Sequence, residues 1–294
     1  MDLSIVKGLQ SLRNPIFDWF FYLVTQIGDQ YVFIFLAVII YWTISKKFAH
    51  KFVFTFMISA IVNTSIKELI KRPRPYIASA SVYTKPSWET TGYSFPSGHA
   101  QAAGVIGYTS YDASKKLNKR WMWYVGIFIL IFVPLSRIYL GQHYLSDVIT
   151  GAVLAFFLSP FIFALVDKMG NDEDIYTLML VPFFILALFF IQNEVMFVAA
   201  GGFTGFSLGY YLEKKYVKYD VKTKMLFQVI KVIFGIAIIF LIRLGLKAIL
   251  PYSTDAETNP LLSDLIFDAI RYFVIGLWAA YGAPLVFKYV IKNR

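Results

Sequence analysis

The sequence contains no cysteine and carries little charge. Only 16% of its 294 residues are Asp, Glu, Lys or Arg. Without cysteine, the chain cannot form disulfides, thiolate metal sites or a cysteine nucleophile. Its 58% hydrophobic content and mean hydropathy of +0.60 leave too little polar surface for a soluble domain of this length. The composition therefore indicates an integral membrane protein.

Long apolar runs recur along the chain and predict a polytopic, all-α membrane bundle. We expect about nine transmembrane helices, at roughly 30–45, 50–71, 98–114, 121–140, 143–166, 175–192, 195–212, 225–250 and 264–287. Residues 3–13 have apolar residues at helical spacing, which predicts an amphipathic helix on the membrane surface. The apolar stretch 16–28 is short, and both an interfacial helix and a tilted span remain open for it.

The formal net charge of +10 raises the question of a nucleic-acid partner. The basic residues, however, form short clusters between apolar runs, which is typical of membrane topology, so we expect no nucleic acid. The clusters fall in the links 46–51, 115–120 and 213–224 and in the tail from 288 onward. All lie on one side of the predicted bundle, which the positive-inside rule makes cytoplasmic. The acidic link 167–174 carries little weight in this rule.

Three polar segments interrupt the apolar pattern on the opposite, outer side. They are KELIKRPRP at 67–75, PSGH at 96–99 and SRIYLGQHYLSD at 136–147. Ionisable residues at membrane depth are costly, so their convergence indicates a functional site. Two of the three histidines in the chain, His99 and His143, belong to these segments.

The third segment places His143 four residues before Asp147, so the two side chains share one face of a helix. An aspartate in that position can accept a hydrogen bond from one ring nitrogen and leave the other free to attack. Ser97 predicts a helix N-cap, and a helix N-terminus favours an anion. Lys67, Arg74 and Arg137 add cationic donors that match phosphate oxygens.

These segments resemble the signature of the type 2 phosphatidic acid phosphatase superfamily, in its membrane lipid phosphate phosphatase branch. The family pattern is Lys, six residues, Arg-Pro; then Pro-Ser-Gly-His; then Ser-Arg, five residues, His, three residues, Asp. Each part occurs here in the same order and spacing. A second Arg-Pro pair begins at Arg72, but only the pair that begins at Arg74 leaves six residues after Lys67.

The resemblance implies a phosphatase that works through a phosphohistidine. His143 would attack phosphorus, Asp147 would hold its ring, and His99 would protonate the leaving alcohol. The phosphate oxygens would be held by Lys67, Arg74, Ser97, the Gly98 amide and Arg137. We expect no metal, because no other carboxylate–histidine cluster has ligand spacing, and the resemblance implies no cofactor.

Other charged residues have plainer interpretations. Arg243, Lys247 and Arg271 stand near the outer ends of two spans and are expected to reach lipid headgroups, with an entrance for an anionic substrate as the alternative. Headgroup contacts are also favoured over phosphate contacts for Lys71 and Arg72.

A ladder of small residues, Gly201, Gly205 and Gly209, lies on one predicted span. Such ladders let helices approach closely, so we predict close helix packing there. A homodimer contact is the alternative.

We predict that the chain dephosphorylates a membrane lipid phosphate without a metal. A glycerolipid monoester, a sphingoid monoester and a polyprenyl pyrophosphate all remain open. The alternatives are a phosphotransferase that uses another acceptor and a lipid-binding or transport protein that uses the C-terminal helices. A haloperoxidase is disfavoured because most known ones are soluble.

The resemblance covers roughly residues 1–166. We predict a phosphatase core at 1–168 and additional transmembrane helices of unassigned role at 169–294. The Phe-, Ile- and Lys-rich composition favours a bacterial cell membrane. The positive-inside rule places the predicted active site on the extracytoplasmic side.

Overall fold

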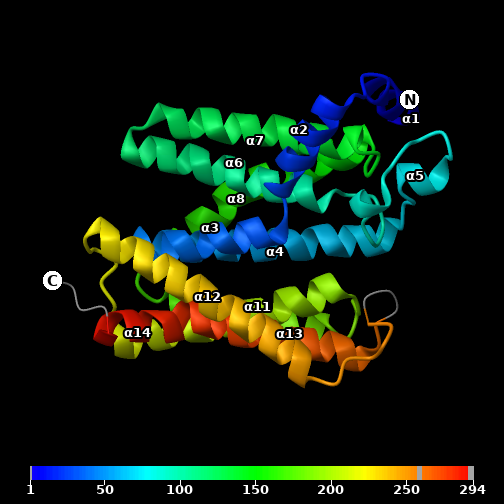
Figure 1. Ribbon diagram of the computed structural model, residues 1–294. Coiled ribbons are helices and arrows are strands. Elements are labelled where there is room, and N and C mark those ends of the chain that lie inside the picture. The colour runs from blue at the N-terminus through cyan, green and yellow to red at the C-terminus, as the bar shows by residue number, and fades with distance from the viewer. Residues whose placement is uncertain (1, 257–259, 291–294) are drawn as a thin grey trace. The chain divides into compact units, whose positions relative to one another are not determined.

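The computed structural model describes residues 2–256 and 260–290, and within these ranges its regular elements are all helices (Figure 1). In chain order they are α1 (Asp2–Gln10), α2 (Pro15–Gln26), α3 (Gln30–Thr43), α4 (Lys46–Ile70), α5 (Pro75–Ala78), η1 (Pro86–Trp88), α6 (Gly98–Leu117), α7 (Arg120–Tyr139), α8 (Leu145–Lys168), α9 (Glu173–Met179), α10 (Val181–Ala187), α11 (Glu194–Leu212), η2 (Glu213–Val217), α12 (Met225–Ile249), α13 (Leu262–Leu277), η3 (Trp278–Gly282) and α14 (Ala283–Val290). Parts of the loop between α12 and α13 and of the basic tail lie outside the described residues.

Among the described helices, six are long and apolar enough to cross a membrane, and the bent pair α2–α3 would make a seventh. The predicted all-helical membrane fold is confirmed, but the count of about nine spans is not. Helix α6, at the predicted span 98–114, is too polar to count as a membrane span, because it contains residues such as Gln101 and Asp112. The predicted span 175–192 is divided into α9 and α10, because Pro182 in the first turn of α10 lacks the N–H that a continuous helix needs.

The chain folds into two compact units. Unit 1 comprises Met1–Ile34 and Ile58–Phe163, and unit 2 comprises Phe35–Met57 and Ala164–Arg294. All three polar segments that the sequence singled out lie in unit 1. The candidate active site is therefore built within one compact unit.

In unit 1, α6 and α7 form an antiparallel hairpin, and α2 packs against α7 (Figure 1). Ser97 caps α6 as predicted, because its hydroxyl accepts a hydrogen bond from Ala100 N at 3.4 Å. At the other end of α6, Asn118 has a φ of 52° and stops the helix in the left-handed conformation. The hairpin thus holds the PSGH segment at one end of unit 1.

Helix α1 begins one residue before the predicted stretch 3–13 and covers most of it, and its apolar side packs within unit 1. Val6 is fully buried and packs in a cluster with Ile138, Tyr144 and Val148 around the α7–α8 turn. The α7–α8 turn offers an apolar surface that the spacing within α1 does not reveal, and the position of α1 at the membrane surface stays a prediction. Burial against that surface removes the apolar side of α1 from water.

A break separates α2 from α3 and bends the pair by 50°. Gly28 lies in this break, and a side chain there would approach Val133 Cγ1 to 2.8 Å and the main-chain oxygen of His99 to 3.0 Å. The missing Cβ therefore lets the break lie against the start of α6. The stretch 16–28, left open by the sequence, belongs largely to α2 and can form one broken span together with α3.

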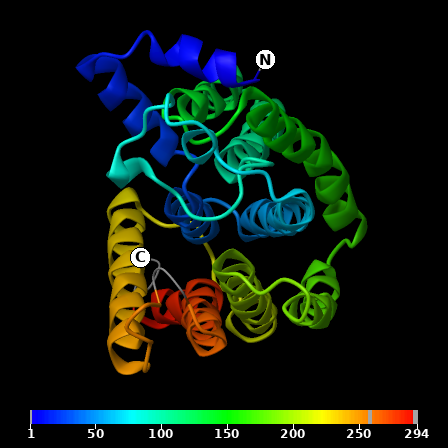
Figure 2. The same cartoon turned by 90° about the vertical axis from the view of Figure 1, so that its right-hand side faces the viewer.

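In unit 2, α11 packs side by side with α13 (Figure 2). A Cβ at Gly201 would run into the backbone of Ala269, and one at Gly205 would run into the backbone of Phe273. The glycine ladder therefore brings two helices of the same chain together, as the packing prediction expected. The alternative of a homodimer contact at this ladder gains no support.

Unit 2 also brings together three charged links that the sequence placed on one side of the membrane. Lys51, in the link 46–51, pairs with Asp167. Lys214 Nζ lies 2.6 Å from Asp174 Oδ1. The acidic link, which the positive-inside rule ignores, thus supplies counter-ions to lysines from both basic links.

Candidate active site

The turn that joins α7 to α8 carries His143, whose side chain is buried. Gly141 enters this turn with a φ of 76°, a conformation that glycine adopts without strain. The amides of Gln142 and His143 both donate to the carbonyl of Arg137, at 3.0 and 3.2 Å. These bonds fix the backbone of His143 against the end of α7.

The two ring nitrogens of His143 have different partners. Arg74 Nη1 lies 3.2 Å from Nε2, and because a guanidinium can only donate, Nε2 is the acceptor. The ring proton then resides on Nδ1, which lies 3.4 Å from Ser94 Oγ and 3.5 Å from Asp147 Oδ2. The ring is therefore held through Nδ1 and presents a lone pair on Nε2, as a nucleophilic imidazole requires.

Asp147 is fully buried on the first turn of α8. Its Oδ2 accepts hydrogen bonds from Tyr144 N at 2.9 Å and from the hydroxyl of Ser94. Its Oδ1 accepts from Arg72 Nη1 at 2.8 Å. These donors offset the cost of burying a carboxylate and fix it beside the imidazole.

The electrostatics of the turn favour a neutral imidazole. Burial lowers the pKa of His143 well below its usual range, and the positive charges of Arg74, Arg137 and Lys67 lower it further. A neutral ring keeps the lone pair on Nε2 available at neutral pH.

Lys67 and Arg74 are both held by the loop that leads to the PSGH segment. Lys67 Nζ donates to the carbonyls of Tyr93, at 2.7 Å, and Pro96, at 2.9 Å. Arg74 Nη2 donates to the carbonyl of Thr91 at 2.8 Å. The loop thereby gathers two cations of the first polar segment next to the start of α6.

Arg137 and His99 complete the cluster. Arg137 is buried, its Nη1 donates to Thr25 Oγ1 at 3.0 Å, and its Nε has no hydrogen-bond partner among the described residues. His99, on the first turn of α6, lies within electrostatic range of both Arg137 and His143. The end of α2 contacts this cluster through Thr25, and the break after α2 contacts it through Gly28.

The starts of α6 and α8 are tied together by the main chain. Ser97 N donates to the carbonyl of Asp147 at 3.0 Å. Gly98 follows as the first residue of α6. Unit 1 therefore brings together every catalytic and phosphate-binding residue expected from the sequence, namely Lys67, Arg74, Ser97, Gly98, His99, Arg137, His143 and Asp147.

Sequence reasoning missed two residues that contact the pair His143 and Asp147, namely Arg72 and Ser94. Arg72 was expected at lipid headgroups, but it donates to Asp147, and its guanidinium lies 3.8 Å from the centre of the Tyr144 ring. The second Arg-Pro pair was the signal that could have suggested this. No sequence pattern marks Ser94, because only the path of the loop brings it to His143.

The proposed entrance residues lie in unit 2, with Arg243 and Lys247 on α12 and Arg271 on α13. Arg271 is buried, and its Nη2 lies 2.5 Å from Asp268 Oδ1. This ion pair gives Arg271 a structural partner within its own unit. A role of the three residues at a substrate entrance stays a prediction.

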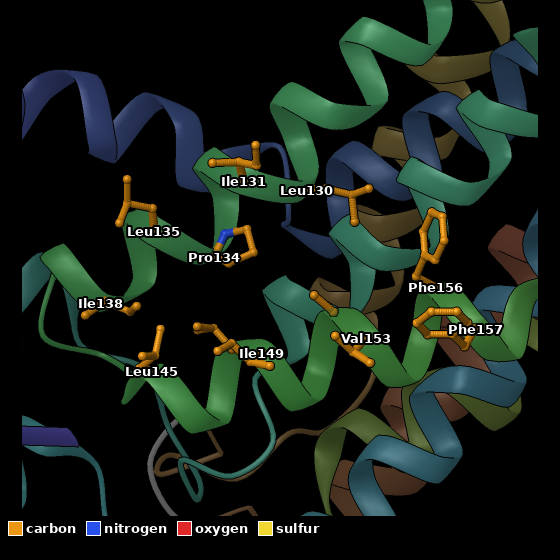
Figure 3. A pocket seen from close by; sticks show the side chains of 12 residues that line it. Leu130, Ile131, Pro134, Leu135, Ile138, Leu145, Ile149, Val153, Phe156 and Phe157 are labelled. Atoms are coloured by element: carbon orange, nitrogen blue, oxygen red, sulfur yellow. The ribbon is translucent and has the colours of Figure 1, made fainter. Parts of the chain in front are cut away.

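An apolar groove runs between α7 and α8 (Figure 3). It has a volume of about 350 Å³ and is lined only by apolar residues, among them Pro134, Ile138, Leu145 and Val153. Ile138 directly follows Arg137, and Leu145 stands two residues after His143. The groove therefore begins at the helix ends that flank the turn with His143.

Comparison with known proteins identifies the family. Residues 48–170 match the PAP2 superfamily, and residues 197–293 match the PAP2 superfamily phosphatase, transmembrane extension. The chain belongs to the PAP2 superfamily. The first match contains all three polar segments, and the second contains α12 and α13. Membership makes the chain an integral membrane phosphatase of the PAP2 type, as the three motifs predicted.

Several relatives are named for the lipid phosphates on which they act. An undecaprenyl-diphosphatase from Sulfolobus acidocaldarius is 29% identical over 153 residues, covering 51% of this chain and 71% of the relative. Sphingosine-1-phosphate phosphatase 1 from Mus musculus is 23% identical over 327 aligned positions, covering 96% of this chain and 74% of the relative. The crystal structure of Aquifex aeolicus LpxE matches with a TM-score of 0.50 at 22% identity, covering 55% of this chain and 94% of that one, and supports the fold.

Proposed function

We propose that this PAP2 phosphatase removes phosphate from a membrane lipid phosphate through a phosphohistidine at His143. The observation that carries the proposal is the placement of one imidazole between two groups. Its Nε2 faces the guanidinium of Arg74 at 3.2 Å, and its Nδ1 faces the carboxylate of Asp147 at 3.5 Å. A phosphate group bound by Arg74 would lie next to the attacking nitrogen.

In the first step, Nε2 of His143 forms a bond to phosphorus while the bond from phosphorus to the lipid oxygen breaks. Burial and the neighbouring cations lower the pKa of His99, and the negative charge of a bound phosphate offsets those cations, so that His99 can carry a proton and give it to that oxygen as it leaves. The ring of His143 becomes positively charged, and Asp147 stabilises it directly and through Ser94. Lys67, Arg74 and Arg137 stabilise the charge that develops on the phosphate oxygens.

In the second step, water attacks phosphorus, the bond from phosphorus to Nε2 breaks, and inorganic phosphate leaves. His99, now deprotonated, takes a proton from the attacking water and is ready for the next cycle. A phosphotransferase would share the first step and pass the phosphate to another acceptor. Analysis of products with and without an added alcohol acceptor separates the two reactions.

Two observations support a lipid substrate. The relatives with the undecaprenyl diphosphate and sphingosine-1-phosphate names both act on phosphates that carry a long hydrocarbon chain. The groove between α7 and α8 offers an apolar surface that begins at the catalytic turn and suits such a chain. A diphosphate, a sphingoid monoester and a glycerolipid monoester all fit this description.

We assign the active site to the extracytoplasmic side of the membrane. Helix α4 begins with Lys46 and Lys47 and has Lys67 near its other end. A helix of 25 residues is about 37 Å long, enough to separate the two ends by the thickness of a bilayer. By the positive-inside rule, the basic links 46–51, 115–120 and 213–224 face the cytoplasm, so the opposite end of α4, with Lys67, faces outward.

The proposed intermediate can be trapped. Purified protein is mixed with a lipid phosphate labelled at phosphorus and quenched in denaturant, and label on the protein is measured across acid and alkaline washes. We expect label that is lost in acid and survives in alkali, and that is missing in His143→Ala. Turnover without label on the wild-type protein, or equal label on the variant, would remove His143 as the nucleophile.

A further inference from the structure

Asp2 stands outside the three polar segments, on the first turn of α1, yet it reaches the surroundings of the catalytic pair. Its Oδ2 accepts a hydrogen bond from Ser146 Oγ at 2.6 Å and another from Arg72 Nη2 at 3.1 Å. Ser146 directly precedes Asp147 on α8. Helix α1 therefore contributes a carboxylate to the residues around the catalytic aspartate.

One guanidinium connects the two carboxylates. Arg72 Nη1 donates to Asp147 Oδ1 at 2.8 Å while Nη2 binds Asp2. Arg72 Nη1 also donates to Ser146 Oγ at 2.7 Å. The orientation of Arg72 is fixed from several directions, and a continuous path of charged groups runs from Asp2 to the ring of His143.

The charges of this network matter for the reaction. Asp2 and Asp147 are both acidic, while Arg72 is the one cation that contacts both. The network therefore keeps net negative charge beside His143, which favours the positively charged ring that attack on phosphorus produces. Without Asp2, Arg72 would largely cancel the charge of Asp147.

Helix α1 is anchored beyond Asp2. Near its other end, Gln10 Nε2 donates to the carbonyls of Tyr83, at 2.8 Å, and Tyr139, at 3.0 Å. Between these contacts, Val6 is fully buried in the cluster around the α7–α8 turn. The position of Asp2 is thus built by the packing of the whole helix.

We propose that Asp2 is a positioning residue of the phosphatase reaction, which holds Arg72 and Ser146 so that Asp147 keeps its negative charge toward His143. This inference rests on the proposed role of His143 as nucleophile. A carboxylate in the first turn of a helix also interacts with the helix dipole. That interaction would affect folding and leave the chemical step unchanged.

The test uses the full chain in detergent with a lipid phosphate that the wild-type protein hydrolyses. We expect Asp2→Asn to lower kcat roughly tenfold, the effect of about 1.4 kcal/mol, with KM nearly unchanged, because the network acts on the transition state. Because Asp2 works through Arg72, the double variant Asp2→Asn/Arg72→Gln should be no slower than Arg72→Gln alone. Asp2→Glu, which keeps the charge, should recover most of kcat.

Lys7→Gln changes an exposed charge on the same helix and serves as the matched control, with kcat expected to equal that of the wild type. Thermal unfolding shows which variants are folded, and Asp2→Ser, which also removes the charge and carries the same expected loss of kcat, replaces Asp2→Asn if the latter does not fold. A kcat for Asp2→Asn equal to the wild type, or effects of Asp2 and Arg72 that multiply, would overturn the inference. Wild-type activity retained by His143→Ala would instead remove the proposed function on which the inference rests.

Discussion

At the residue scale, the ring of His143 is held by contacts on both nitrogens and is buried from water. Arg74 fixes the position of Nε2, Ser94 and Asp147 lie on the Nδ1 side, and burial removes water from both. Burial and the neighbouring cations disfavour the protonated ring before substrate binds. A bound phosphate brings negative charge to those cations, so the ring can become positive when it is phosphorylated.

The lowered pKa of His143 predicts how activity depends on pH. The neutral ring is the nucleophile, so activity should persist as pH falls through 6.5 and decline only at the lower pKa of the buried ring. In a plot of kcat/KM against pH, we expect the acidic limb that reports the protonation of His143 to lie below pH 6.5. The second ionisation of a monoester substrate, near pH 6, is titrated separately by phosphorus NMR in the same detergent. A limb above pH 6.5 that the substrate does not explain would contradict this account.

The motifs predicted the residues of the site better than their contacts. His143, Asp147 and Arg74 could be found because fixed residue types recur at fixed spacing along the chain. Arg72 and Ser94 could not, since their contacts with Asp147 depend on the path of the loop after α5. A loop of this kind has no periodic pattern from which its course can be predicted.

At the scale of elements, the catalytic cluster depends on helix ends and breaks. The starts of α6 and α8 carry His99 and Asp147, and the break between α2 and α3 lies against His99. The sequence predicted most of these helices from their apolar runs. It left the stretch 16–28 open, because a short apolar run does not reveal whether the following break is packed against another element.

Replacement of Gly28 by alanine should therefore affect catalysis. The added Cβ would approach Val133 Cγ1 to 2.8 Å and the main-chain oxygen of His99 to 3.0 Å, so the start of α6 must shift. We expect kcat of Gly28→Ala to fall roughly ten- to a hundredfold, because small displacements of catalytic groups are costly.

The matched control for this prediction is Gly245→Ala on α12, where an added Cβ would meet nothing within 4 Å beyond the adjoining residues and backbone of its own helix. It should leave kcat unchanged. Both variants are compared by thermal unfolding to separate a local shift from loss of the fold. A Gly28→Ala protein with wild-type kcat would show that the break does not position His99.

At the scale of the whole molecule, the three motifs lie together in one of the two units. Unit 1 contains the three motifs, and unit 2 contains α11 to α14 and the charged links that pair with one another. Hydropathy predicted most of the spanning helices, but it overcounted spans at α6 and at 175–192. The polar residues of α6 and the proline of α10 explain the difference.

We propose that this PAP2 phosphatase hydrolyses a lipid phosphate at His143 without a metal. The most direct test measures phosphate release by the detergent-purified protein in EDTA, beside His143→Ala. The panel comprises undecaprenyl diphosphate, sphingosine 1-phosphate, phosphatidylglycerol phosphate, phosphatidic acid and glucose 6-phosphate. We predict release from one or more of the lipids that falls at least about a thousandfold in the variant. Release from glucose 6-phosphate alone, release abolished by EDTA, or equal release by the variant would contradict the account.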